Sequence, residues 1–286
     1  MISIADLLAT GEPLPLPGVW DALSAKLAAR AGFRAVFVSG YCLSATRLAK
    51  PDFGFITQTE VLDAAARICA AVDVPVIVDV DTGYGNAFNV ERTIEELQRA
   101  GAAGCFLEDQ VWPKRCGHME GKRIVPTDEY LPKLRAALAT RAGTPFHVTA
   151  RTDARAAHSL DEAITRARLF ADTGADAVFV EAPESIDEMT TIRNAVPATT
   201  TLVANMVEQG KTPVRTVREL GAAGYQMIVL PVAGLLAATR ALQDLYAELF
   251  RSGVSAAMTA RMLPFPEMNE LLDLATYYTR ETRWRG

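Results

Sequence analysis

The sequence predicts an α/β fold, a single (β/α)8 TIM-type barrel over residues 1–286, with a C-terminal helical extension from about residue 234. Short apolar runs rich in Val, Ile and Phe alternate with longer amphipathic runs rich in Ala, Leu, Glu and Arg. Continuous apolar runs are typical of parallel strands buried on both faces. About eight such strands, each followed by a helix, indicate a closed barrel, and this chain length is ordinary for one.

The strands are expected at 15–21, 35–40, 75–82, 104–109, 146–152, 177–182, 201–206 and 226–232. Amphipathic helices are expected at 22–32, 59–72, 89–101, 128–143, 160–174, 186–196 and 216–224, after a short helix and a Pro/Gly turn at the start. Several end in glycine, the usual residue after a helix, and two begin with acidic residues that suit the helix dipole. A doubly wound open sheet is the alternative, but its Gly-rich dinucleotide fingerprint is missing after the first strand.

Composition narrows the class of protein. The net charge of −5 argues against a nucleic-acid partner or an anionic membrane surface. No apolar stretch has the length to cross a bilayer, and the first residues lack a signal-peptide pattern. Four cysteines without CxxC spacing, three of them in apolar surroundings, favour reduced thiols and a cytoplasmic location. The tail has apolar faces beyond what a barrel needs, which predicts packing on a partner subunit.

Active sites of such barrels form at the C-terminal strand ends, and carboxylates are concentrated there. Several carboxylates aimed at one cavity repel one another unless a cation lies among them, and hard oxygen ligands suit Mg²⁺. Taken singly, each carboxylate is also explained as a helix cap. The polar residues at these ends are Ser39, Gly40, Asp79, Asp81, Glu108, Asp109, Arg151, Asp153, Glu181 and Asn205.

The stretch DVDTGYGN is the strongest indication of a metal site. Asp79 and Asp81 are two residues apart, so both are expected on the same side of their strand. The glycines that follow allow the backbone to approach a ligand closely. Arg151 is expected to hold a carboxylate or phosphoryl group opposite, and an ion pair with Asp153 is the structural alternative.

The stretch QVWPKRCGHMEGKR places one thiol, Cys116, among several cations on a segment with glycines at 117 and 121. Nearby cations lower the pKa of a thiol. The functional interpretation is a nucleophile or a general acid, and the structural one is an exposed thiol in a charged loop. The sequence has no Cys–His–Asn arrangement, which favours proton donation over acyl transfer. His147 and His158 are interpreted as ordinary core and surface histidines.

These motifs together resemble the isocitrate lyase/phosphoenolpyruvate mutase superfamily. The resemblance is carried by KRCGH, DVDTGYGN, LEDQ, ARTDA, VEA and ANMVEQGKTP, in order, from about Pro17 to the tail. It implies a (β/α)8 barrel whose C-terminal helix is swapped between subunits, in a homotetramer built as a dimer of helix-swapped dimers. This assembly would account for the surplus apolar tail.

The resemblance also implies the roles of individual residues. Asp79 would bind Mg²⁺ directly, with Mn²⁺ as an alternative ion, and Asp52, Asp81 and Glu108 would hold its waters. Ser39, Gly40 and Arg151 would hold the substrate carboxylate. Glu181 and Asn205 would complete the pocket, with Tyr41 beside the carboxylate site.

Residues 113–122 would form a gating loop, here called the cysteine loop, that closes over the substrate and excludes water. Cys116 would be the catalytic acid, supported by Lys114 and His118. The implied reaction is Mg²⁺-dependent cleavage of the C–C bond of a 2-hydroxy di- or tricarboxylate, of the 2-alkylmalate or 2,3-dimethylmalate type. Carboxyphosphonoenolpyruvate mutase, methylisocitrate lyase and oxaloacetate hydrolase activities remain alternatives.

Overall fold

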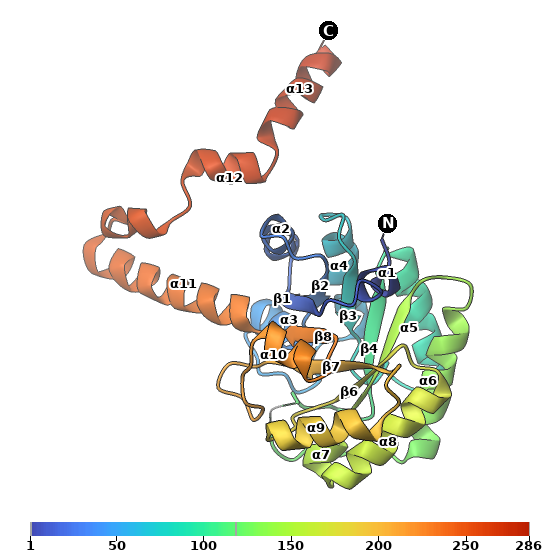
Figure 1. The fold of residues 1–286 in the computed structure, drawn as a ribbon. Helices are drawn as coiled ribbons and strands as arrows, with labels where there is room; N and C mark the ends of the chain where they lie inside the picture. Colours follow the sequence, from blue (N-terminus) through green and yellow to red (C-terminus); the bar gives the residue numbers. More distant parts are fainter. Residues whose placement is uncertain (1, 118, 286) are drawn as a thin grey trace. The chain divides into compact units, whose positions relative to one another are not determined.

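The computed structural model describes residues 2–117 and 119–285. Within them, eight parallel strands close into a barrel in chain order, and the last pairs with the first (Figure 1). The predicted (β/α)8 barrel is confirmed. The strands are β1 (Leu14–Val19), β2 (Val36–Val38), β3 (Val76–Asp79), β4 (Gly104–Glu108), β5 (His147–Thr152), β6 (Ala177–Val180), β7 (Thr201–Asn205) and β8 (Met227–Leu230).

The helices that connect the strands lie around the barrel (Figure 1). Two of them, α3 and α7, were not predicted from the sequence. The helices are α1 (Ile4–Leu8), α2 (Ala22–Arg30), α3 (Gly40–Leu48), α4 (Gln58–Cys69), α5 (Ala87–Arg99), α6 (Thr127–Thr140), α7 (Ala154–Ala157), α8 (Leu160–Thr173), α9 (Ile186–Ala195), α10 (Val217–Ala222) and α11 (Ala233–Ser252), then the 3₁₀ helix η1 (Ala256–Arg261), α12 (Phe265–Leu271) and α13 (Leu274–Arg285).

The chain divides into two compact units, Met1–Leu236 and Ala237–Gly286. The first contains the barrel. The second is helical, and within this single chain it exposes many apolar side chains. None of the helices in the described residues is both long and apolar enough to cross a bilayer. The large exposed aromatic residues of the second unit are Tyr246, Phe250, Phe265, Tyr277, Tyr278 and Trp284.

The barrel interior and the layer between strands and helices form separate apolar clusters, because successive side chains of a strand point to opposite faces. Inside the barrel, the rings of Phe37 and Phe106 lie 4.9 Å apart, and those of Phe106 and Phe179 lie 5.8 Å apart. Ile4 and Leu7 of α1 pack into the same interior cluster. The three aromatic rings give the site above them an apolar floor.

The helix starts place side chains near the C-terminal ends of the strands. Asp21 caps α2, and its Oδ1 accepts a hydrogen bond from the backbone of Ser24 at 2.7 Å. The strand predicted at 35–40 is shorter than expected, because Ser39 caps α3 and Gly40 already belongs to that helix. The backbone N–H groups at the start of α3 therefore follow β2 directly.

Burial of His147 predicts a loss of stability in mild acid. The side chain is 4% exposed, and burial lowers its pKa to about 4. Between this pKa and the unfolded-state pKa of about 6.5, the His147 imidazole is protonated in the unfolded chain and neutral in the folded chain. The free energy of unfolding should therefore fall by up to about 3 kcal/mol as the pH drops from about 6.5 to 4.

Urea unfolding at several pH values would measure this slope, the change in the free energy of unfolding per pH unit. His147→Leu should remove it, whereas His158→Leu, at an exposed histidine, should keep it. Equal slopes in the wild type and His147→Leu would contradict the assignment.

Candidate active site

One cavity of about 410 Å³ gathers most of the predicted site residues. Its floor is formed by the rings of Phe37, Phe106 and Phe179. Gly40, Asp81 and Glu108 do not line the cavity themselves but contact residues that do. His118 lies outside the described residues. The predicted residues that line the cavity are Ser39, Tyr41, Asp52, Asp79, Lys114, Cys116, Arg151, Glu181 and Asn205.

Asp79 and Asp81 converge, but not in the way the sequence suggested. Strand β3 ends at Asp79, and Asp81 has a left-handed backbone with φ +49°, so the two do not share one face of a strand. The turn instead folds back on itself, and Asp79 Oδ1 accepts a hydrogen bond from the backbone of Asp81 at 3.1 Å. The prediction that a strand spacing of two aligns them was wrong. The turn brings them together.

Gly40 lets both carboxylates approach the start of α3. A Cβ at this position would lie 2.9 Å from Asp79 Oδ2 and 3.5 Å from Asp81 Oδ1. Glycine is therefore the residue that fits between the helix start and these two carboxylates. Because the N-terminus of a helix carries partial positive charge, this placement favours anionic groups there.

Lys114 lies among the carboxylates of Asp52, Asp79, Asp81 and Glu108, here called the acidic cluster. Its ammonium is 2.6 Å from Asp52 Oδ2 and 2.8 Å from Asp81 Oδ1, and the residue is 3% exposed. Burial alone would lower the pKa of Lys114, but the surrounding carboxylates outweigh burial and raise it well above its ordinary value. Lys114 is therefore charged and offsets part of the carboxylate charge.

Arg151 occupies the other half of the site, on β5. Its guanidinium contacts Asp153 Oδ2 at 3.0 Å, Glu181 Oε2 at 3.2 Å and Glu108 Oε2 at 3.3 Å. The ion pair with Asp153 is present, and it is one of three that Arg151 makes among the described residues. Asn205 Nδ2 donates to Glu181 Oε2 at 3.2 Å and so fixes that carboxylate.

The donor set fits a divalent cation. Burial raises the pKa of Glu108 well above its ordinary value, and its Oε1 is buried with no hydrogen-bond partner among the described residues. Such an oxygen is suited to accept from a water or to meet a cation. Within the described part of the chain, no group of three or more Asp, Glu, His or Cys side chains is placed so that it could hold a metal ion by itself.

The cysteine loop lies across the cavity. Cys116 is half-buried and lines the cavity, and its backbone N–H donates to the carbonyl of Asp52 at 3.1 Å. The side chain of Gln110 holds the loop through hydrogen bonds of 2.8 and 3.0 Å to the backbone of Arg115. The thiol therefore shares one cavity with Arg151 and Asp79.

Sequence reasoning missed two parts of this site. The cations around Cys116 do not act alike, because Lys114 and Lys122 point into carboxylates whereas Arg115 lies over the ring of Phe53 at 5.5 Å. The only sequence signal for Lys122 was the Gly-Lys pair that ends the loop. Most of the apolar wall was also missed: Tyr41 was predicted, whereas Met119, Val207, Val232 and Leu236 were not.

A parallel eight-stranded barrel carries buried carboxylates, an arginine and a loop thiol around one cavity, which is the arrangement of an enzyme active site. The chain matches the family model described as phosphoenolpyruvate phosphomutase over residues 4–250. It belongs to this family, within the phosphoenolpyruvate mutase/isocitrate lyase superfamily.

Curated relatives cover nearly the whole chain. The chloroplastic carboxyvinyl-carboxyphosphonate phosphorylmutase of Arabidopsis thaliana is 45% identical, over 94% of this chain and 80% of its own. The petal death protein of Dianthus caryophyllus is 45% identical, over 95% and 85%. The 2,3-dimethylmalate lyase of Eubacterium barkeri is 44% identical, over 94% and 92%.

Solved structures agree with these relatives. A 2,3-dimethylmalate lyase superposes with a TM-score of 0.92 at 33% identity, covering 100% of this chain and 97% of its own. An oxaloacetate acetylhydrolase bound to 3,3-difluorooxaloacetate gives 0.91 at 35% identity, covering 97% and 94%. A phosphonopyruvate hydrolase with oxalate and Mg²⁺ gives 0.87 at 28% identity, covering 98% and 96%. The chain is a carbon–carbon lyase of this superfamily.

Proposed function

We propose that the protein cleaves the C2–C3 bond of 2-alkylmalates, including 2,3-dimethylmalate, into a 2-oxo acid and a carboxylate. One observation carries the proposal: Cys116, Arg151, Ser39 and Asp79 line the same cavity. That cavity therefore joins a proton donor, an anion-binding group and a cation-binding group, which are the parts that this reaction needs.

The apolar wall favours an alkyl substituent over a third carboxylate. Tyr41, Met119, Val232 and Leu236 contribute hydrocarbon surface to the lining of the cavity. Lys211, the cation that lines the cavity beyond β7, is ion-paired with Glu120 of the cysteine loop. A tricarboxylate such as methylisocitrate would have to separate that pair, so we rank it second.

Mg²⁺, with Mn²⁺ as an alternative, is the proposed cofactor. Asp79 would hold the ion, and Asp52, Asp81 and Glu108 would hold its waters. The ion would polarise the 2-oxygen of the substrate and stabilise the negative charge that develops on it.

The residues of this chain supply the remaining steps. Arg151 and the backbone at Ser39 and Gly40 hold the substrate carboxylate. A carboxylate of the acidic cluster, for which Asp52 is our candidate, accepts the proton of the 2-hydroxyl group as the C2–C3 bond breaks. The electron pair of that bond passes to C3, and Cys116 donates its proton there. The closed cysteine loop excludes water while the carbanionic fragment exists.

A substrate panel tests the proposal. Purified protein with Mg²⁺ should release 2-oxobutyrate from 2-ethylmalate and pyruvate from 2,3-dimethylmalate, measured as the hydrazone. Methylisocitrate and oxaloacetate belong in the panel, and phosphorus NMR on carboxyphosphonoenolpyruvate tests mutase activity. The proposal fails if alkylmalates are not cleaved while the metal is bound.

Gly40→Ala should weaken Mg²⁺ binding without unfolding the protein. The new methyl group would push Asp79 Oδ2 away from its position, and displaced ligand groups typically cost roughly 10- to 100-fold in metal affinity. Calorimetric titration with Mg²⁺ measures this loss. Gly234→Ala is the matched control, because its Cβ would make an ordinary contact of 3.5 Å with Trp20. Unchanged Mg²⁺ affinity in Gly40→Ala would contradict the metal assignment.

We also propose a homotetramer that exchanges C-terminal helices, in the cytoplasm. The exposed aromatic residues of the second unit, such as Phe250 at 96% and Phe265 at 77%, support burial against another subunit. Light scattering coupled to gel filtration should give four times the chain mass of 30.9 kDa.

A further inference from the structure

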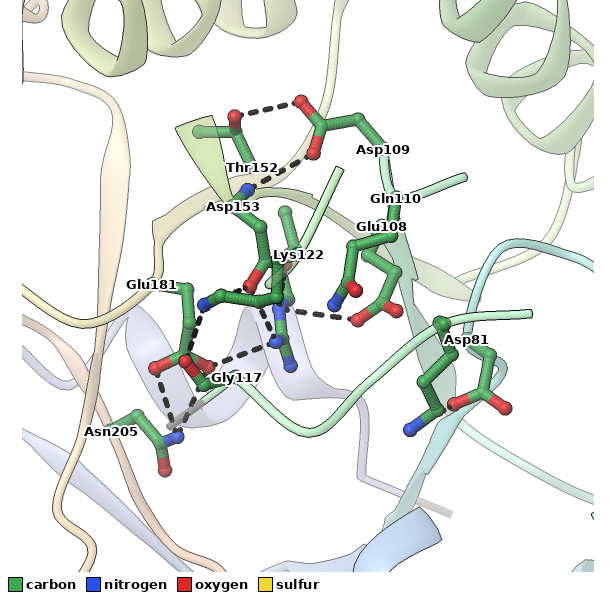
Figure 2. Close-up of polar contacts among 12 residues, drawn as sticks. Asp81, Glu108, Asp109, Gln110, Gly117, Lys122, Thr152, Asp153, Glu181 and Asn205 are labelled. Atoms are coloured by element: carbon green, nitrogen blue, oxygen red, sulfur yellow. Dashed lines mark hydrogen bonds and ion pairs between the residues drawn. The ribbon is translucent and has the colours of Figure 1, made fainter. Parts of the chain in front are cut away.

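A buried lysine at the end of the cysteine loop takes no part in the reaction as proposed above. The Lys122 side chain is 1% exposed, and its ammonium donates to the carbonyl of Gly117 and, at 2.8 Å, to Asp153 Oδ1 (Figure 2). The first contact lies within the loop, and the second lies just after β5 of the barrel. One charged group therefore joins the loop to the barrel.

Asp153 extends this connection to the arginine of the cavity. Its carboxylate is fully buried and also accepts from Arg151, from Nε at 3.0 Å and from Nη2 at 3.2 Å. Burial alone would raise the pKa of Asp153, but Arg151 and Lys122 outweigh it and lower the pKa below its ordinary value. The ionised carboxylate is thus shared between a cation of the loop and a cation of the substrate site.

Gly117 lies directly against the Arg151–Glu181 pair. A Cβ at position 117 would lie 2.4 Å from Glu181 Oε2 and 2.6 Å from Arg151 Nη2. The loop therefore approaches the pair as closely as a backbone without a side chain allows. The carbonyl that Lys122 holds belongs to this glycine, and Cys116 is the residue before it. The position of the Cys116 thiol thus depends on the contact between Lys122 and Gly117.

We propose that Lys122 is a positioning residue. By tying Gly117 to Asp153, it seats the cysteine loop on Arg151 and holds Cys116 over the substrate. Opening the loop must break a buried hydrogen bond of a charged group, so Lys122 favours the closed state. The turnover arm of the test rests on the proposed function, whereas the thiol-accessibility arm needs no turnover.

Thiol accessibility is measured with iodoacetamide and mass spectrometry of the peptide that contains Cys116. In Lys122→Met the loop should open more often, and Cys116 should be alkylated roughly 10- to 100-fold faster, the factor expected for one charge-assisted hydrogen bond. Arg123→Met, at the exposed neighbouring cation, should match the wild type. Cys42 and Cys69 should stay protonated, because burial raises their pKa values to about 12 and about 11.

On any substrate that the wild type cleaves, Lys122→Met should lower kcat by a similar factor and change KM much less. Lys122→Arg, which keeps the charge and the donors, should recover part of the closed state. If Lys122→Met does not fold, Lys122→Gln replaces it. If Cys116 of Lys122→Met is alkylated at the wild-type rate, the proposal is overturned, even where the variant is less stable to heat. An unchanged kcat overturns it as well. A protein that cleaves no alkylmalate still tests Lys122 by alkylation.

Discussion

Cys116→Ser is expected to lower kcat by roughly 100- to 10,000-fold, the usual contribution of a general acid. A serine hydroxyl is a far weaker acid than a thiol, so the carbanionic fragment would wait for a proton from water that the closed loop excludes. Cys116 is half-buried and the replacement is smaller only by the sulfur-to-oxygen change, so the fold should persist.

Steady-state kinetics on the best alkylmalate and a thermal unfolding curve measure both effects. Cys69→Ser is the matched control, because Cys69 lies on α4 and does not line the cavity. Undiminished turnover in Cys116→Ser would remove the proposed acid role. Equal losses in both variants would point to a general effect on packing.

Lys114→Met is expected to destabilise the folded protein by about 3–5 kcal/mol, the usual result of removing one partner from a buried ion pair. Its ammonium lies between Asp52 and Asp81, with Asp79 close by, and without it these carboxylates repel one another. A divalent cation in the same cluster would replace part of the lost positive charge. Ions that bind only the folded state stabilise it by mass action.

Urea unfolding with and without millimolar Mg²⁺ should therefore show a larger stabilisation by the ion in Lys114→Met than in the wild type. Lys50→Met, at an exposed lysine over the ring of Phe55, should behave like the wild type in both conditions. A Lys114→Met protein as stable as the wild type would show that the acidic cluster does not need this charge. A variant that Mg²⁺ does not stabilise would argue against an ion in the cluster.

The strands were predictable from local pattern, and the start of α3 was not. Parallel barrel strands are buried on both faces, so their sequences are continuous apolar runs that stand out against the helices. The stretch AVFVSGYCL continues such a run past the point where β2 ends, and nothing local distinguishes strand from helix at Gly40. Only the contact of Gly40 with Asp79 gives the reason for a glycine there.

The sequence also pointed to the residues of the site without their arrangement. Asp79 and Asp81 were expected together, and they meet through a left-handed turn at Asp81 that no side-chain spacing reveals. Arg151 was expected to bind an anion, and in the folded chain it already contacts three carboxylates. How many N–H groups of Arg151 remain to bind a substrate therefore depends on these three carboxylates.

By itself the sequence determined the barrel, the family and the types of groups at the strand ends, because apolar periodicity and short motifs are local properties of the chain. The tertiary structure alone decided the pairing of charges. Lys114 meets Asp52 across 62 residues, and Lys122 meets Asp153 across 31. Such pairs form because barrel closure brings separate strand ends into one low-dielectric space, where each buried charge needs a partner.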